Sequence, residues 1–373
     1  MSEKKSLLVD KSKMPLAMGL AFVAFTTQFG GGFASGAQIY QYFINYGIWC
    51  LILPLVTQGL YALFFWYGMR YAYKHKTYDY RSFSDSMYGK TRHVMSNLYE
   101  ICYLIMIGTA SAAAFATGGS TLQTLFGIPY WVCTLIIAAF IFFIALYGTN
   151  VVRKCASTLS VLIIIGLVLV LVPNIIAQWG DISANISASM ANPAPFGKAL
   201  WIGFVYAAFQ LASIGLLVQH AKPFASPDDA KTSMLQGFFV NVLICLMAVL
   251  GLMAITNDPD FPTSSIPLLI LVNRGVAPGV LRPIISILIV LGSVSTAVNM
   301  IAGMSNRVCS SLDKNFDPTA KPGVKVIVVT LICTVVAFGI AQLGLNKIVA
   351  VGYKYLGYLT IPVIMIPYLV HMA

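Results

Sequence analysis

The chain alternates between long apolar runs and short polar breaks. A helix needs about 20 mostly apolar residues to cross a bilayer, and ten runs reach or approach that length. They span residues 16–44, 47–69, 95–126, 129–149 and 156–177, and then 199–219, 234–255, 280–306, 324–343 and 346–372. The pattern predicts an all-α polytopic membrane protein with ten transmembrane helices, preceded by a polar N-terminal segment over residues 1–15.

The layout of the runs repeats along the chain. Residues 16–177 and 199–373 each hold five runs, and the polar stretch 178–198 connects them. Within each half the second and third runs are separated by a long polar connection, at 71–93 and at 256–279. Because each half has an odd number of spans, the two halves enter the membrane from opposite sides. This layout predicts a 5+5 inverted repeat.

Composition and charge agree with this interpretation. Hydrophobic residues make up 58% of the 373 residues and charged residues 9%, whereas soluble domains carry about 25% charged residues. The net charge of +11 comes from 23 Lys and Arg against 12 Asp and Glu. Most of these cations fall in the N-terminal segment and in connections on one side of the predicted layout. The positive-inside rule then predicts that both termini are cytoplasmic, and it explains the basic charge without nucleic acid.

The first and sixth runs are interrupted. The first contains four glycines within seven positions, 30–36, and each costs up to about 1 kcal/mol relative to Ala in a helix. The sixth carries the polar residues Gln210 and Ser213 at mid-depth. Unwound backbone is tolerated there only if it is buried in protein or lines a cavity. Glycines can also serve close helix packing, but breaks at matching positions of both halves predict a binding site.

The chain resembles a known group of transporters at this point. Ten spans as inverted repeats with interrupted spans 1 and 6 look like the amino acid, polyamine and organocation superfamily, which has the LeuT fold. Within it, the segment Gly30-Gly31-Gly32-Phe33-Ala34-Ser35-Gly36-Ala37-Gln38 is similar to the glycine-rich signature of YkvI-type putative amino acid permeases. The resemblance implies an amino acid transporter of the prokaryotic cytoplasmic (inner) membrane.

A zwitterionic substrate needs a partner for its carboxylate, and the N-terminus of a half-helix offers free N–H groups with positive dipole character. Gly31, Gly32 and Phe33 lie where the second part of span 1 would begin. By resemblance to the GxG turn of the superfamily, Gly30 and Gly32 match this carboxylate site. The wall of the cavity would come from the break in span 6, through Tyr206, Phe209 and Gln210.

Span 8 carries the pair Ser295-Thr296 one turn after Gly292. The pair and the Gly292 carbonyl resemble the sodium site that this fold shares between spans 1 and 8. The resemblance implies that Thr26 and Phe29 complete the site with their carbonyls. The hydroxyls could instead bond to backbone one turn back. Proton-coupled members can place a basic residue of span 5 in this pocket, but residues 157–173 contain no ionisable side chain, which favours Na⁺ as the coupling ion.

Two ionisable residues lie at membrane depth, where such residues are functional candidates. Lys354 is about two turns into span 10 and could gate the outer side, contact an anionic group, or bond to helix-end carbonyls. Glu100 is near the inner end of span 3. It could form a charge pair with Arg92, His93 or Lys154, or take part in proton coupling.

The function that fits these features is secondary active transport of small amino acids or related zwitterions by alternating access. The alternatives are a proton-coupled transporter of an anionic carboxylate substrate and, in a different class, a channel, which would need repeated carbonyls or a ring of charges. An enzyme is not expected, because the sequence has no HExxH or GxSxG motif. We expect a small-molecule substrate and the lipid bilayer as partners, with Na⁺ as the coupling ion. We expect no cofactor, no transition metal and no nucleic acid. The sequence does not determine the oligomeric state.

Overall fold

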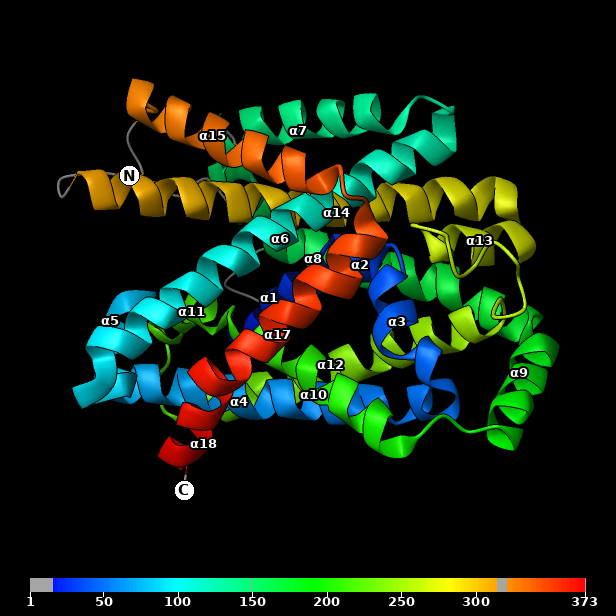
Figure 1. The fold of residues 1–373 in the computed structure, drawn as a ribbon, viewed down its shortest axis with the longest axis horizontal. Helices are drawn as coiled ribbons and strands as arrows, with labels where there is room; N and C mark the ends of the chain where they lie inside the picture. Colours follow the sequence, from blue (N-terminus) through cyan, green and yellow to red (C-terminus); the bar gives the residue numbers. More distant parts are fainter. Residues whose placement is uncertain (1–15, 148, 314–320, 373) are drawn as a thin grey trace.

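The computed structural model describes residues 16–147, 149–313 and 321–372, and the secondary structure within these ranges is entirely helical (Figure 1). Seven helical segments are long and apolar enough to cross a membrane. Two further pairs of helices meet the same criteria if each bent pair is one span, and Ala17–Gln28 forms a shorter apolar helix. The protein is therefore an integral membrane protein with at least seven spans.

The first half of the chain begins with an interrupted span and ends with three long helices. Its helices are α1 (Leu16–Gln28), α2 (Gly31–Ala34), α3 (Ala37–Tyr42), η1 (Ile44–Leu51), α4 (Leu53–His75), α5 (Tyr80–Tyr88), η2 (Gly89–Thr91), α6 (Arg92–Phe126), α7 (Tyr130–Tyr147) and α8 (Thr149–Ala177).

The remainder of the chain begins with a surface helix, which is followed by a second broken span. Its helices are α9 (Trp179–Ala191), α10 (Phe196–Leu211), α11 (Ile214–Leu217), η3 (Val218–Ala221), α12 (Asp228–Met253), α13 (Pro267–Arg274), α14 (Pro278–Leu312), α15 (Val324–Ala341), α16 (Leu345–Lys347), η4 (Ile348–Tyr353), α17 (Lys354–Thr360), η5 (Ile361–Met365) and α18 (Ile366–Met372). The segments η4 and η5 are π-helical.

The polar connections contain helices that the hydropathy pattern does not predict. The connection 71–93 holds α5, 178–198 holds α9, and 256–279 holds α13. In α5 the side chain of Asp79 accepts hydrogen bonds from the first-turn N–H groups of Arg81 and Ser82. One face of this helix buries Phe83 and Met87, which are four residues apart and therefore on the same side. Amphipathic helices of this kind have too little apolar character to resemble a span.

The second span is bent rather than straight. Ile44–Leu51 and Leu53–His75 meet at 78°, within what the sequence presents as one run. Gly47 has φ +59°, a backbone conformation that glycine adopts without steric cost. Pro54 then lies in the first turn of α4, where proline fits because its missing N–H has no partner in the helix. Gly47 and Pro54 together account for the start of α4 at an angle to η1.

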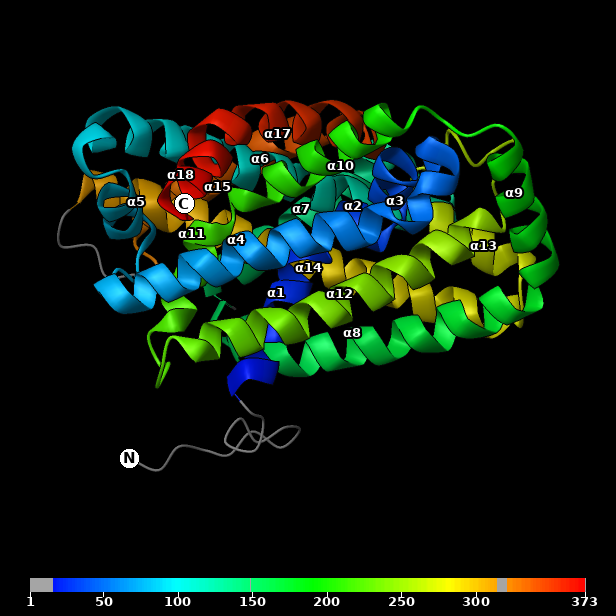
Figure 2. The same ribbon diagram turned by 90° about the horizontal axis from the view of Figure 1, so that it is seen from below.

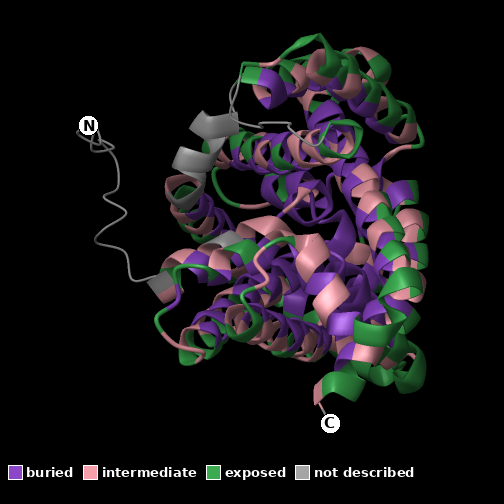
Figure 3. Cartoon of the chain, turned by 90° about the vertical axis from the view of Figure 1, so that its left-hand side faces the viewer, coloured by how far each residue is buried: buried purple, intermediate pink, exposed green. Residues whose placement is uncertain are grey.

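The long helices α6 and α14 form the centre of the molecule. Their most apolar stretches are 67% and 61% buried, compared with 33% for α7 and 28% for α15. Viewed along the molecule, buried residues fill the interior and exposed ones form the outer shell (Figure 3). The outer shell includes apolar side chains such as Phe140 and Phe143. Exposed apolar surface on this scale fits contact with lipid.

The remaining long helices pack around this centre. α12 lies between α4 and α8, and α1 packs against α12 (Figure 2). We call the end of the molecule that carries α5 and α18 the α5 end, and the opposite end, with α9 and α13, the α9 end (Figure 1).

Candidate functional site

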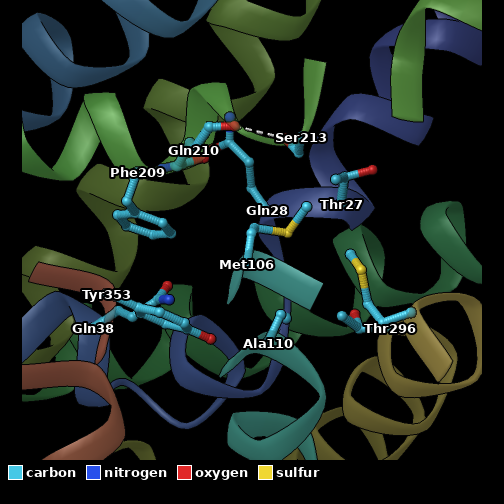
Figure 4. Close-up of a pocket in the computed structure, with 12 residues that line it drawn as sticks. Thr27, Gln28, Gln38, Met106, Ala110, Phe209, Gln210, Ser213, Thr296 and Tyr353 are labelled. Atoms are coloured by element: carbon cyan, nitrogen blue, oxygen red, sulfur yellow. Dashed lines mark hydrogen bonds between the residues drawn. The ribbon is translucent and has the colours of Figure 1, made fainter. Parts of the chain in front are cut away.

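The two broken spans meet at a cavity of about 50 Å³ (Figure 4). The residues that line it come from α1, α3, α6, α10, α14 and η4 and from the two breaks. They are Thr27, Gln28, Gly30, Gln38, Met106, Ala110, Phe209, Gln210, Ser213, Thr296, Met300 and Tyr353. Gly30, Phe209, Gln210 and Thr296 are the members of this set that the sequence predicts. The cavity has room for a few water molecules or a very small ligand.

None of the lining residues is acidic or basic. Three glutamines, Gln28, Gln38 and Gln210, contribute amide groups, each of which can both donate and accept hydrogen bonds. The Nε2 of Gln28 is buried near the Tyr61 side chain, and neither this nitrogen nor the Tyr61 hydroxyl makes a hydrogen bond of normal geometry among the described residues. An unpaired buried donor costs about 1–3 kcal/mol. A bound polar molecule would remove this cost.

The break in span 1 is sharp and has free donors. α1 ends at Gln28, and Gly30 is extended, with φ −76° and ψ 179°. The carbonyl of Gly30 accepts hydrogen bonds from the N–H groups of Phe33 (3.0 Å) and Ala34 (2.9 Å). The N–H groups of Gly31 and Gly32 open α2 and have no acceptor within it. Gly31 and Gly32 do not line the cavity themselves but directly follow Gly30, which does, so their role as carboxylate donors stays a prediction.

The three consecutive glycines have different surroundings. A Cβ on Gly31 would lie 2.7 Å from the carbonyl oxygen of Ala113 in α6, whereas one on Gly30 would lie 3.5 Å from Thr296 Cγ2, an ordinary contact. A Cβ on Gly32 would lie 2.9 Å from Gln38 Cγ. Gly31 therefore serves close packing, which the sequence gives as the alternative. Of the three glycines, only Gly30 lines the cavity; Gly31 and Gly32, which the sequence also assigns to the substrate site, do not.

Phe33 and Tyr206 do not line the cavity, contrary to the sequence-based prediction. The ring of Phe33 packs on that of Phe29, with centroids 5.6 Å apart. Tyr206 is fully buried and packs against Tyr42 (5.0 Å) and Phe43 (5.1 Å). Its position on α10 is one turn before Gln210, but its side chain points into this aromatic cluster. The cluster lies behind the cavity wall.

The break in span 6 is held from α6. The carbonyl of Gln210 accepts hydrogen bonds from the N–H (3.0 Å) and the hydroxyl (2.7 Å) of Ser213 (Figure 4). The Tyr99 hydroxyl accepts from the N–H of Gly215 at 2.8 Å and donates to the carbonyl of Ala212 at 3.5 Å. These bonds satisfy backbone groups that the missing helical turn would otherwise leave unpaired. Tyr99 therefore stabilises the break.

The structure brings several residues of the predicted sodium site together. A Cβ on Gly292 would lie 3.4 Å from the carbonyl oxygen of Phe29, so the end of α1 touches α14 there. Thr296, one turn further along, lies beside Gly30 and lines the cavity. Ser295 is half-buried and does not line it, and the Thr26 hydroxyl donates to the carbonyl of Phe22 at 3.1 Å. The Na⁺ ligand set stays a prediction.

Tyr353, not Lys354, faces the cavity. Its ring stacks on that of Phe209 with centroids 4.7 Å apart and planes 9° apart, and both rings line the cavity. Lys354, the next residue, is half-buried, and its Nζ lies 6.0 Å from the centre of the Tyr358 ring. Successive helical residues point about 100° apart, which separates the two side chains. The structure thus places Lys354 outside the cavity.

Glu100 forms ion pairs with partners that the sequence does not predict. Its carboxylate lies 2.7 Å from Arg307 of α14 and 3.3 Å from Arg81 of α5. The Arg307 guanidinium also lies over the ring of Tyr80, 5.1 Å from its centre. Arg92 and His93 are not ion-pair partners of Glu100, and the Lys154 side chain lies outside the described residues. The charge network joins α5, α6 and α14 at the α5 end.

Sequence reasoning missed Gln28, Gln38 and Tyr353. Gln28 and Gln38 flank the glycines within an otherwise apolar run. Polar amides inside a span commonly bond across helices, so their presence on both sides of the break is a usable signal. Tyr353 has no such signal, because an aromatic residue in an apolar run usually packs in the core.

Comparisons with known proteins bear on the fold. No family model matches the sequence, and no curated protein shows significant similarity to it. A crystal structure of the Eremococcus coleocola manganese transporter superposes with a TM-score of 0.61 at 14% identity, covering 95% of this chain and 78% of that chain. A Na⁺-coupled sialic acid symporter in a substrate-bound outward-open state gives 0.58 at 13% identity, covering 93% and 76%. These neighbours are membrane transporters, not enzymes. The protein shares their fold.

Proposed function

We propose that the protein is a secondary active transporter of small amino acids or related zwitterions, coupled to Na⁺ and working by alternating access. The observation that carries this proposal is the uncharged cavity, lined by amides, hydroxyls and apolar side chains, at the junction of the two broken spans. Substrate sites of secondary transporters lie near the bilayer midplane, where interrupted helices expose backbone groups.

The substrate class follows from the chemistry of the lining. A net charge buried without a partner is expensive, and the cavity offers no charged partner among its lining residues. The N–H groups of Gly31 and Gly32 would bind the carboxylate. The glutamine amides would bind the amino group, and the rings of Phe209 and Tyr353 would enclose a small side chain. A manganese ion or an anionic sugar would find a poorer fit here.

Sodium coupling would use the contact between α1 and α14. The Phe29 carbonyl and the Thr296 hydroxyl lie on facing sides of this contact, next to Gly292 and Gly30. The Thr296 hydroxyl oxygen would lie 3.8 Å from a Cβ on Gly30, and Thr296 lines the cavity, so an ion bound there would be within its reach. A proton-coupled transporter of an anionic substrate is the alternative, but it would need a titratable acid or base at the cavity.

The architecture that we propose has ten spans in a 5+5 inverted repeat of the LeuT type, as in YkvI-type permeases. The interrupted unit α1–α3 and the bent pairs η1–α4 and α10–α11 would complete the seven longer spans. We further propose that the α5 end faces the cytoplasm of a prokaryotic cell, because the cationic connections lie there.

Equilibrium binding tests the proposal. Purified protein is titrated with radiolabelled glycine, alanine, serine, leucine, glutamate and lysine in NaCl and again in choline chloride. We expect saturable binding of a small neutral amino acid that weakens at least tenfold, about 1.4 kcal/mol of coupling, when choline replaces Na⁺. Saturable binding restricted to glutamate would contradict the substrate class, and equal affinity in both salts would contradict sodium coupling.

A further inference from the structure

A second cavity, far larger than the central one, opens at the α5 end. Its volume is about 470 Å³, within the roughly 300–1,000 Å³ of small-molecule sites. Its lining consists of basic and aromatic side chains from α4 and α18, namely Tyr67, Arg70, Tyr71, Lys74, His75 and His371. We call it the basic groove. None of its lining residues belongs to the central cavity.

The two cations of the basic groove lack acidic partners. Arg70 and Lys74 are four residues apart on α4 and therefore share one face. The ion pairs among the described residues involve Arg81, Arg274 and Arg307 but neither of these two cations. The Arg70 guanidinium lies 5.5 Å from the centre of the Trp66 ring. Two uncompensated positive charges in one concave site attract an anion.

The aromatic walls of the groove are fixed. The Tyr67 hydroxyl donates to the carbonyl of His371 at 2.9 Å and so ties α4 to α18. The Tyr71 hydroxyl shares a 2.9 Å hydrogen bond with Ser86 of α5, and the Tyr71 ring stacks on that of His75 at 4.0 Å. The walls of the groove therefore come from α4 and α18, and the hydrogen bond to α5 holds Tyr71 in place.

The basic groove lies at a level of α4 that matches the surface of a bilayer. Nearer the start of the helix, Leu55 and Leu63 expose 46% and 41% of their surface, as lipid-facing residues do. Trp66, Tyr67 and Tyr71 follow, and aromatic belts of Trp and Tyr mark the membrane–water interface. Arg70 and Lys74 lie within this belt and just beyond it. At that depth the anions are the phosphates of lipid headgroups.

We propose that the basic groove binds a phosphate group, supplied by the headgroup of an anionic phospholipid. Arg70 would bind two phosphate oxygens with its planar guanidinium, and Lys74 would add a second charge. Basic pockets between membrane helices are suited to such headgroups. The bound lipid would fasten α4 to α18 without touching the central cavity. The site depends on the membrane location of the fold and not on the identity of the transported substrate.

Native mass spectrometry of the full chain tests the site. Purified protein in detergent is titrated with phosphatidylglycerol or phosphatidylcholine, and in a separate arm phosphatidylglycerol is competed with inorganic phosphate. The variant is Arg70→Gln with Lys74→Gln. The control is Lys231→Gln with Lys325→Gln, which removes the same charge from two exposed cations outside the groove. Circular dichroism and size exclusion check that both variants fold.

We expect the wild type and the control to bind phosphatidylglycerol in preference to phosphatidylcholine. The groove variant should lose affinity for phosphatidylglycerol roughly thirtyfold, from about 1 kcal/mol per cation near the surface. If millimolar inorganic phosphate displaces phosphatidylglycerol from the wild type but not from the groove variant, the groove is a phosphate site. Its natural ligand would then be a soluble phosphate and not a lipid headgroup. Equal phosphatidylglycerol binding by the groove variant and the control, with no phosphate effect, would overturn the proposal.

Discussion

A methyl group added at Gly31 tests how the break in the first span is held. The ideal Cβ would lie 2.7 Å from both the carbonyl oxygen of Ala113 and the hydroxyl of Thr117, and 2.8 Å from the α-carbon of Ala114. Two of these three contacts are backbone of α6, the central helix. Backbone of a buried helix cannot move aside cheaply. Overpacking of this kind costs about 1–3 kcal/mol.

Gly30→Ala is the matched control for Gly31→Ala. Gly30 has φ −76°, which alanine adopts without strain, and its Cβ would meet Thr296 Cγ2 at 3.5 Å. Replacing glycine at a compatible position stabilises by about 0.4–1 kcal/mol through the unfolded state. The expected stabilities of the two variants therefore differ by about 1.4–4 kcal/mol, although each variant adds one methyl group and the two glycines are adjacent.

The assay is thermal unfolding of the purified protein in detergent, followed by tryptophan fluorescence, together with amino acid binding at a temperature where both variants are folded. Gly31→Ala should unfold several degrees below the wild type. Gly30→Ala should unfold at or above the wild-type temperature but bind substrate more weakly, because its methyl group enters a cavity of about 50 Å³. Equal unfolding temperatures for the two variants would refute the assignment of Gly31 to packing against α6.

Three further predictions address the ion site, the cavity wall and the charge network. Ser295→Ala combined with Thr296→Ala should reduce the Na⁺ dependence of substrate binding at least tenfold, about 1.4 kcal/mol, and an unchanged dependence would exclude these hydroxyls as ligands. Tyr353→Ala should weaken equilibrium binding of the amino acid, whereas Lys354→Met should leave it unchanged because the Lys354 side chain lies outside the cavity. Weaker binding in Lys354→Met with normal binding in Tyr353→Ala would instead indicate that Lys354 contacts the substrate. Glu100→Gln should lower the free energy of unfolding by about 1–2 kcal/mol, as measured by thermal unfolding. This is less than the loss of a buried ion pair costs, because the side chains are partly exposed. An unchanged midpoint of unfolding would show that the ion pairs of Glu100 do not stabilise the protein.

The apolar runs predict the long helices well because a span must satisfy its backbone internally and face lipid. That constraint leaves a strong signal in α6, α12 and α14. The shorter helices α5, α9 and α13 leave no such signal. They lie at the ends of the molecule, where water satisfies exposed groups and polar residues are tolerated.

The candidate site is predictable in part. The glycines and Gln210 locate the two breaks, because broken backbone requires permissive or polar residues. Which side chain then faces the cavity depends on the rotation of the helix about its axis, which the sequence does not reveal. A charged residue within a span is a functional candidate whether or not its side chain points into the cavity. Lys354 and Tyr353 illustrate this, since the neutral residue of the pair lines the cavity. The ion-pair partner of Glu100 could not be predicted from the sequence either, because Arg307 is 207 residues away along the chain.

Amino acid uptake by the protein in sealed liposomes is the decisive test of Na⁺-coupled transport. Purified protein is reconstituted with Na⁺ outside and choline inside, and uptake of the radiolabelled neutral amino acid that binds best is followed over time. We expect saturable uptake that raises the internal amino acid above its external concentration and that collapses when the Na⁺ gradient is dissipated. Non-saturable flux that only equilibrates the amino acid across the membrane, with or without Na⁺, would contradict it.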